Sequence, residues 1–178
     1  ILPSISNLCR RFRDAGRPIV HVIRIYTADA TDADRCRKAS LLAGEQLLLK
    51  GSAGRRPADS LLPAKDIHIE DDLLMAGKIQ SIGLAEVLVY KPRWGAFYRT
   101  HLDAHLREQS VSTLVFCGCN YPNCPRTSIY QASERDYRIT AVVDAISGIN
   151  PSDISGLANI GVNCATSQEV ARSLGKTP

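Results

Sequence analysis

The chain has 178 residues, of which 44% are hydrophobic and 22% are charged, and its formal net charge is +4. This length and composition are typical of one globular domain. No apolar run reaches the roughly eighteen residues that cross a bilayer, so we expect no membrane partner. The basic residues are scattered and only ten aromatic residues are present, so we expect no nucleic-acid partner either.

The cysteines and the first residues indicate the cellular compartment. Six cysteines are present, without a C-x-x-C pair or the spacing of a structural zinc site, so we expect neither a metal nor a cofactor. No secretory signal is visible, which favours reduced thiols and a cytoplasmic location. The sequence starts at Ile1 rather than at a methionine, and we therefore expect a further segment upstream.

In chain order, residues 4–15 have apolar residues at helical spacing and end before Gly16, which suits a helix C-terminus. Residues 19–23 then form an apolar run of strand length. Residues 27–83 give a poor signal, and we interpret them as substrate-facing loops or oligomer contacts without separating the two.

The second half of the chain alternates between strands and helices. Because such alternation gives parallel strands joined by helical crossovers, we expect a single-domain, Rossmann-like α/β fold over residues 1–178. It has three layers, with a mostly parallel sheet and helices on both faces. The predicted strands are 86–90, 113–117, 138–143 and 162–165, and the predicted helices are 100–109, 124–135, 153–158 and a last one after 167.

Two reactive side chains come directly after predicted strands. Lys91 follows strand 86–90, and Cys124 follows the turn after strand 113–117. Ligands of open parallel sheets bind beyond the carboxyl ends of the strands. With Pro125 as the first helical residue, Cys124 would be the N-cap, where the helix dipole favours a thiolate and free amides can bind an oxyanion. The alternative is a buried, inert cysteine.

Two blocks around these residues resemble the isochorismatase-like cysteine hydrolases, which use an Asp–Lys–Cys triad. They are Lys91-Pro92-Arg93-Trp94-Gly95-Ala96-Phe97 and Gly118-Cys119-Asn120-Tyr121-Pro122-Asn123-Cys124-Pro125-Arg126-Thr127. The resemblance implies Cys124 as nucleophile, Lys91 as the lysine, a cis peptide between Cys119 and Asn120, and an oxyanion hole of the Asn120 and Cys124 amides. No residue matches the aspartate, which ends the family's first strand. We therefore expect that this strand is missing from residues 1–178.

The cysteine also narrows the predicted reaction. Members that cleave isochorismate typically lack it, so Cys124 favours hydrolysis of an amide or carbamoyl C–N bond through a thioester. The alternatives are a related hydrolase of another bond, a non-catalytic scaffold, and a redox sensor with Cys119 as the resolving thiol. The family implies a small-molecule substrate and a homo-oligomer, dimer or tetramer.

Five further residues are candidates for the substrate wall. For Trp94 and Phe97, packing in the core is an equally weighted interpretation, and for Arg126 an exposed helix position is at least as well supported. The candidates for substrate binding are Arg93, Trp94, Phe97, Tyr121 and Arg126.

Overall fold

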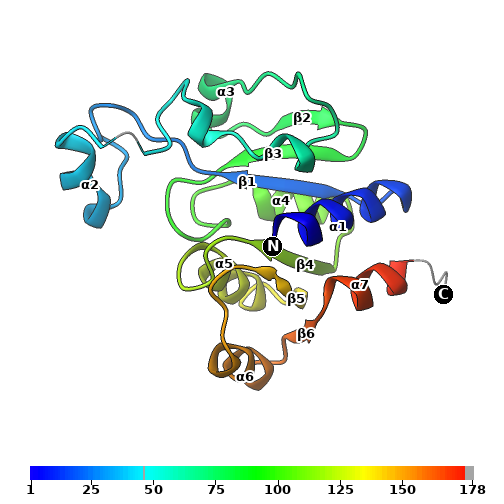
Figure 1. The fold of residues 1–178 in the computed structure, drawn as a ribbon. Coiled ribbons are helices and arrows are strands. Elements are labelled where there is room, and N and C mark those ends of the chain that lie inside the picture. Colours follow the sequence, from blue (N-terminus) through cyan, green and yellow to red (C-terminus); the bar gives the residue numbers. More distant parts are fainter. Residues whose placement is uncertain (46, 175–178) are drawn as a thin grey trace.

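The computed structural model describes residues 1–45 and 47–174 and has an α/β fold in three layers (Figure 1). The fold class and the mostly parallel arrangement of the strands are as predicted, but the described strands form two three-stranded sheets. The first sheet has the order β1-β3-β2 and the second the order β4-β5-β6. Among the described residues, no helix is long and apolar enough to cross a membrane.

The first sheet combines a parallel pair with an antiparallel edge strand. β1 and β3 pair in parallel, from Ile19 opposite Glu86 to Ile23 opposite Tyr90, and β2 joins β3 in the antiparallel direction. β2 lies in the region without a clear signal and was missed from the sequence. The strands are β1 (Ile19–Ile23), β2 (Gln80–Gly83) and β3 (Glu86–Tyr90).

The second sheet is parallel throughout and follows the predicted alternation. Its strands are β4 (Thr113–Gly118), β5 (Arg138–Ile146) and β6 (Asn163–Ala165), connected by α5 (Cys124–Ser133) and α6 (Pro151–Asn159). β5 runs three residues beyond its predicted end. α6 begins with a capping box, in which the side chains of Asn150 and Asp153 each accept a hydrogen bond from the other's backbone N–H.

Helices cover both faces of the sheets. α4, α5 and α6 pack over the larger core, whose central residues include Val89, Leu106, Ile129 and Leu157. On the other face, Ile5 and Leu8 of α1 pack with Val170 of α7 and with β5 residues. The helices not yet given are α1 (Leu2–Asp14), α4 (Leu102–Glu108) and α7 (Ser167–Leu174).

Residues 27–83 are built mainly from loops and short helices, which explains their weak sequence signal. Helix α2 projects away from the body of the molecule in Figure 1 and buries only Leu41 among its residues. Short helices give little periodicity to detect. The elements here, besides β2, are α2 (Arg35–Leu42), η1 (Ala53–Arg55), η2 (Asp59–Leu61) and α3 (Asp71–Met75).

One edge of β1 and one edge of β4 have no partner strand among residues 1–45 and 47–174. Side chains of both strands pack against the same core, including Val20 and Val22 of β1 and Leu114 and Phe116 of β4. All four are only partly buried, although their strands lie in the middle of the molecule. Central strands normally have both edges hydrogen-bonded, so each of these two edges could pair with a further strand.

Candidate active site

Lys91 is a buried cation at the carboxyl end of β3. Its backbone N–H donates to the carbonyl of Ile23, 3.0 Å away, and so extends the ladder between β1 and β3. Its side chain donates to the carbonyls of Arg93 (3.1 Å) and Trp94 (2.6 Å), and the residue is only 5% exposed. None of the ion pairs within the described part of the chain includes Lys91. A buried ammonium normally has an anionic partner, so this site is electrostatically incomplete.

Cys124 is the first residue of α5. Asn123 takes the N-cap position and Pro125 follows Cys124 within the first turn, so Cys124 is the first helical residue and not the N-cap that we predicted. The difference arises because Asn123, rather than Cys124, has the non-helical backbone that precedes the first turn. The thiol is still in the first turn, where the helix dipole stabilises an anion. Cys124 is half-buried, which leaves the sulfur within reach of a ligand.

The other cysteines differ from Cys124 in their surroundings. Burial raises the pKa of the Cys117 thiol to about 12, and burial also raises the pKa of Cys9 and of Cys164. Thiols with raised pKa values stay protonated and are poor nucleophiles at neutral pH. Cys36 and Cys119 are exposed, and Cys36 lies on α2.

Hydrogen bonds join the loop after Lys91 to the helix that begins with Cys124. The N–H of Ala96 donates to Oγ of Ser128 (3.0 Å), and that hydroxyl donates to the carbonyl of Cys124 (2.7 Å). The N–H of Phe97 donates to Oε1 of Gln131 (3.0 Å). The structure therefore brings the two sequence blocks together, although 33 residues separate Lys91 from Cys124 in the chain.

A glycine makes this contact possible. A Cβ atom added to Gly95 would lie 2.2 Å from Oε1 of Gln131. Any larger residue would push the loop away from α5 or displace the Gln131 side chain. Gly95 thus has a packing reason to lie within the lysine block.

The turn that leads into Cys124 is fixed by Ser147, which follows β5. The N–H of Tyr121 donates to the Ser147 carbonyl (2.7 Å), and the Ser147 hydroxyl donates to Oδ1 of Asn120 (2.6 Å). The peptide bond between Cys119 and Asn120 is cis, at the position that the resemblance implies. Within residues 1–45 and 47–174, the amides of Asn120 and Cys124 donate no hydrogen bond. They are available to an oxyanion.

The structure places the five candidates for the substrate wall in different environments. Tyr121 and Phe97 are 2% and 5% exposed and belong to the main core, so packing accounts for both rings. Trp94 is half-buried and the Arg37 guanidinium lies over its ring, 5.8 Å from the centroid. Arg126 is exposed on α5. Arg93 is engaged by protein groups, because Nη1 donates to the carbonyls of Asp32 (2.8 Å) and Pro92 (2.6 Å).

Sequence reasoning missed a buried polar cluster beside Lys91. It consists of Arg24, Tyr26, Asp32, Asp34 and Tyr90, which we call the Arg24 cluster. Nη1 of Arg24 donates to Oδ2 of Asp32 (2.9 Å) and to the Tyr90 hydroxyl (2.8 Å). The Tyr26 hydroxyl donates to Oδ2 of Asp34 (2.8 Å). Burial raises the pKa of Tyr26 to about 12 and raises that of Tyr90 further, so both hydroxyls remain donors.

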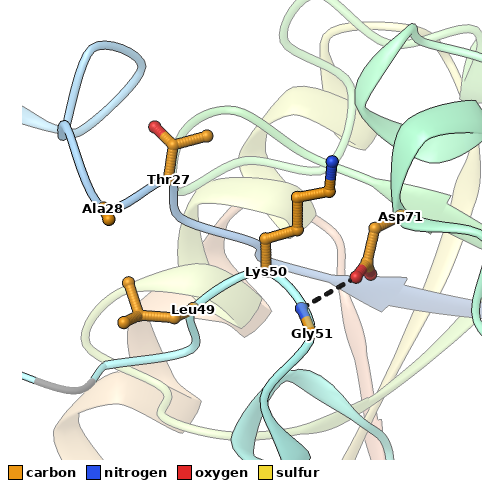
Figure 2. Close-up of a pocket in the computed structure, with 6 residues that line it drawn as sticks. All are labelled: Thr27, Ala28, Leu49, Lys50, Gly51 and Asp71. Atoms are coloured by element: carbon orange, nitrogen blue, oxygen red, sulfur yellow. Dashed lines mark hydrogen bonds between the residues drawn. The ribbon is translucent and has the colours of Figure 1, made fainter.

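A cavity of about 470 Å³ lies next to the backbone of Tyr26 and is lined by none of the predicted site residues (Figure 2). It is lined by Thr27, Ala28, Leu49, Lys50, Gly51 and Asp71. Oδ2 of Asp71 accepts the Gly51 N–H (2.9 Å) and Oδ1 accepts Nε of Arg55 (2.5 Å). Because both carboxylate oxygens of Asp71 already accept hydrogen bonds from protein groups, we assign no reaction to this cavity. The described residues also include no group of three His, Cys, Asp or Glu side chains arranged to hold a metal ion.

Comparisons with known proteins show which sequences and structures this chain is similar to. A family model described as "Isochorismatase domain" matches residues 1–168. The chain is 26% identical to a probable inactive nicotinamidase of Arabidopsis thaliana over 98% of this chain and 83% of that protein. It is 30% identical to the ureidoacrylate amidohydrolase RutB of Methylobacterium radiotolerans over 66% of this chain and 39% of RutB. The crystal structure of an isochorismatase family protein from Desulfovibrio vulgaris superposes with a TM-score of 0.80 and 29% identity, over 98% of this chain and 84% of that one.

Proposed function

Because the chain belongs to the isochorismatase family, we propose that it hydrolyses an amide or carbamoyl C–N bond of a small molecule, with Cys124 as the nucleophile. The observation that carries this proposal is a half-buried cysteine in the first turn of α5 together with a buried lysine whose following loop is hydrogen-bonded to the same helix. An amidohydrolase among the relatives supports the class of bond.

Lys91 has one N–H left for a reacting group. A lysine ammonium has three donors, and the carbonyls of Arg93 and Trp94 accept two of them. The third can donate to a thiolate or to a carboxylate. The positive charge favours the ionised form of Cys124, which is the nucleophilic form. We infer that the counter-ion of Lys91 is the anion that takes part in the reaction.

The reaction follows in two stages. The Cys124 sulfur adds to the carbonyl carbon, and the amides of Asn120 and Cys124 stabilise the oxyanion. Collapse of the tetrahedral adduct breaks the C–N bond, and ammonia or an amine leaves with a proton supplied by an acid at the site. Water then attacks the thioester, which releases the carboxylic or carbamic acid and restores the thiol. Two moderate barriers replace one high barrier.

The proposed reaction also needs an acid–base group. α1 begins at the sheet edge where β1, β3 and β4 end (Figure 1). A parallel strand ahead of α1 could pair with the free edges of β1 and β4 and would then end at the same edge as Lys91. Such a strand, followed by α1 and β1, would form a crossover of the kind that joins parallel strands. We propose that residues upstream of Ile1 form this strand and that its end carries the carboxylate of the triad.

The test is release of ammonia or amine from a panel of small amides and carbamoyl compounds by the full chain. For a compound that is hydrolysed, Cys124→Ala should lower the rate by about a thousandfold or more, because it removes the nucleophile. Cys36→Ala removes an exposed thiol on α2 and serves as the matched control, with an unchanged rate.

Two results would contradict the proposal. One is a Cys124→Ala variant that hydrolyses the identified compound as fast as the unmodified chain. The other is a well-folded full chain that hydrolyses no member of the panel although Cys124 is reduced. This second result would favour a non-catalytic role, as the name of the Arabidopsis relative suggests for that protein.

A further inference from the structure

The Arg24 cluster surrounds the strand end that carries Lys91. Arg24 directly follows β1 and Tyr90 is the last residue of β3, so both come from paired strands. Asp32 and Asp34 come from the loop after β1. Arg24 is 9% exposed, and its guanidinium lies over the Tyr26 ring, 4.0 Å from the centroid. This is a costly set of charges to bury, and the reaction proposed above does not use it.

Asp32 is the member of the cluster that contacts both sides of Lys91. Its carboxylate accepts hydrogen bonds from Arg24 and from the hydroxyl of Tyr90, the residue before Lys91. Its backbone carbonyl accepts Nη1 of Arg93, two residues after Lys91, at 2.8 Å. That carbonyl also accepts Nη2 of Arg24, at 3.0 Å. One residue of the loop after β1 thus holds the residues that flank the lysine.

These contacts act on the groups that orient the ammonium. The Lys91 side chain is held by the carbonyls of Arg93 and Trp94. The Arg93 side chain is held mainly by Asp32, whose carbonyl accepts Nη1 at 2.8 Å, while Nη1 also donates to the Pro92 carbonyl and Nε lies 3.9 Å from Oδ1 of Asp34. The position of the Arg93 backbone depends on this anchor. The Tyr90 side chain, tied to the Asp32 carboxylate, fixes the end of β3 from the other side. A small displacement of a catalytic group can lower the reaction rate strongly. The contacts of Asp32 with Tyr90 and Arg93 should therefore affect the position of the reacting atoms.

We propose that Asp32 is a positioning residue for Lys91, which fixes the residues on both sides of the lysine through the Tyr90 hydroxyl and the Arg93 guanidinium. This proposal rests on the proposed function, because it assumes that the Lys91 ammonium acts on Cys124. It assigns a role to the loop after β1, a region without an interpretable sequence motif.

The experiment measures the rate at which iodoacetamide alkylates Cys124 in the full chain at one fixed pH, with peptide-resolved mass spectrometry to separate the six cysteines. Tyr90→Phe removes the hydroxyl between Asp32 and the strand that carries Lys91 and leaves the pair of Arg24 and Asp32 in place. Tyr26→Phe is the matched control, since it removes a hydroxyl bonded to Asp34 in the same cluster. Lys91→Met is then combined with each variant in a double-mutant cycle.

We expect Tyr90→Phe to slow the alkylation of Cys124 by about threefold or more and Tyr26→Phe to leave the rate nearly unchanged. In the Tyr90→Phe background, Lys91→Met should have a smaller effect than in the unmodified chain, because the ammonium is already displaced. A general loss of stability would not produce this coupling. Asp32→Ala, if it folds, should show the same coupling more strongly.

The outcomes separate the two proposals. If Lys91→Met leaves the alkylation rate unchanged in every background, the lysine does not act on Cys124, and the proposed function and the role of Asp32 both fail. If Lys91→Met slows alkylation but Tyr90→Phe behaves like Tyr26→Phe, or its effect simply adds to that of Lys91→Met, only the role of Asp32 is wrong.

Discussion

The two ends of β3 hold two buried charged groups that differ in how completely they are neutralised. Glu86, at the amino end, accepts two hydrogen bonds from Arg13 of α1 (2.6 and 2.8 Å) and is 2.6 Å from Nε2 of His21 in β1. Lys91, which follows the carboxyl end, donates its side-chain hydrogen bonds to two backbone carbonyls, and no ion pair among the described residues includes it. Both residues are at most 5% exposed.

The difference separates structural from chemical roles within one strand. The Glu86 group is complete in itself, so its charges can hold α1, β1 and β3 together. The Lys91 ammonium has no anionic partner within the described residues. A buried charge without such a partner is typical of a functional site, where it acts on a ligand or on another side chain. The side chains at the carboxyl end of the sheet are thus the ones arranged for a ligand or a reacting atom.

The largest effect is expected at the incomplete end. Lys91→Met should lower the rate of C–N hydrolysis by about a hundredfold or more, because it removes the charge that stabilises the reacting anion. The rate is measured on a compound that the unmodified chain hydrolyses, with circular dichroism to confirm the fold. A variant that keeps its full rate would place Lys91 with Glu86 among the structural charges.

At the amino end of β3, a substitution of Glu86 should lower stability and leave activity unchanged. Glu86→Gln leaves the Arg13 guanidinium and the His21 ring without their anion, and we expect the free energy of unfolding to fall by about 2 to 3 kcal/mol. This is below the usual range for buried pairs because Arg13 is partly exposed. The activity per folded molecule should stay the same. Urea denaturation measures the change, with the exposed Glu108→Gln as a control that has almost no effect.

A smaller effect is expected where the lysine loop meets α5. Gly95→Ala forces the Gln131 side chain to move and breaks its hydrogen bond to Phe97, which should cost about 1 kcal/mol of stability. It should also slow the alkylation of Cys124 as the loop shifts. Gly156→Ala on α6 is the control, because nothing lies within 4 Å of the added methyl group. It should stabilise the fold by about 0.5 to 1 kcal/mol. Equal effects of the two substitutions would show that the contact at Gly95 is unimportant.

The smallest effect concerns pH. Burial lowers the pKa of His21 below its usual 6.5, although Glu86 opposes this. Glu86 has a lowered pKa as well, because its hydrogen bonds to Arg13 and His21 outweigh the effect of burial. For both groups the unfolded chain binds protons more readily, so stability is full above about pH 6.5 and falls as the pH drops through that value and then through about 4.5.

The two groups can be told apart by substitution. His21→Asn should remove the upper part of this decline and leave the part due to Glu86. Midpoints of urea denaturation between pH 4 and 8 provide the measurement. A stability that rises as the pH falls from 7 to 5 would contradict the assignment.

The parts that could be predicted from the sequence are those with regular patterns. The strands at 19–23 and 86–90 match the structure, because continuous apolar runs and their flanking turns identify buried strands. Helix α1 is predicted within two residues of its ends, and Gly16 adopts the positive φ expected of a residue after a helix. Lys91 and Cys124 were selected because each follows a predicted strand in a parallel topology, and their catalytic roles stay predictions.

The remaining features depend on contacts between distant residues. Asp32 looks like an ordinary loop residue, since its partner Tyr90 is brought to the end of β1 only by the pairing of β1 with β3. Tyr121 lies three residues before Cys124 in the sequence but turns into the core, which no local pattern could reveal. β2 pairs with β3 through a short antiparallel connection inside a region of low periodicity.

We propose above that Cys124 attacks the substrate while Lys91 stabilises the anion. The most direct test is acid quenching of the full chain during hydrolysis of its fastest amide or carbamoyl substrate, followed by mass spectrometry of the peptide that contains Cys124. We expect an acyl or carbamoyl group on the Cys124 sulfur, which forms as the amine is released and is absent from Cys124→Ala. Release of the amine without any adduct on Cys124, or an adduct on Cys119 instead, would contradict it.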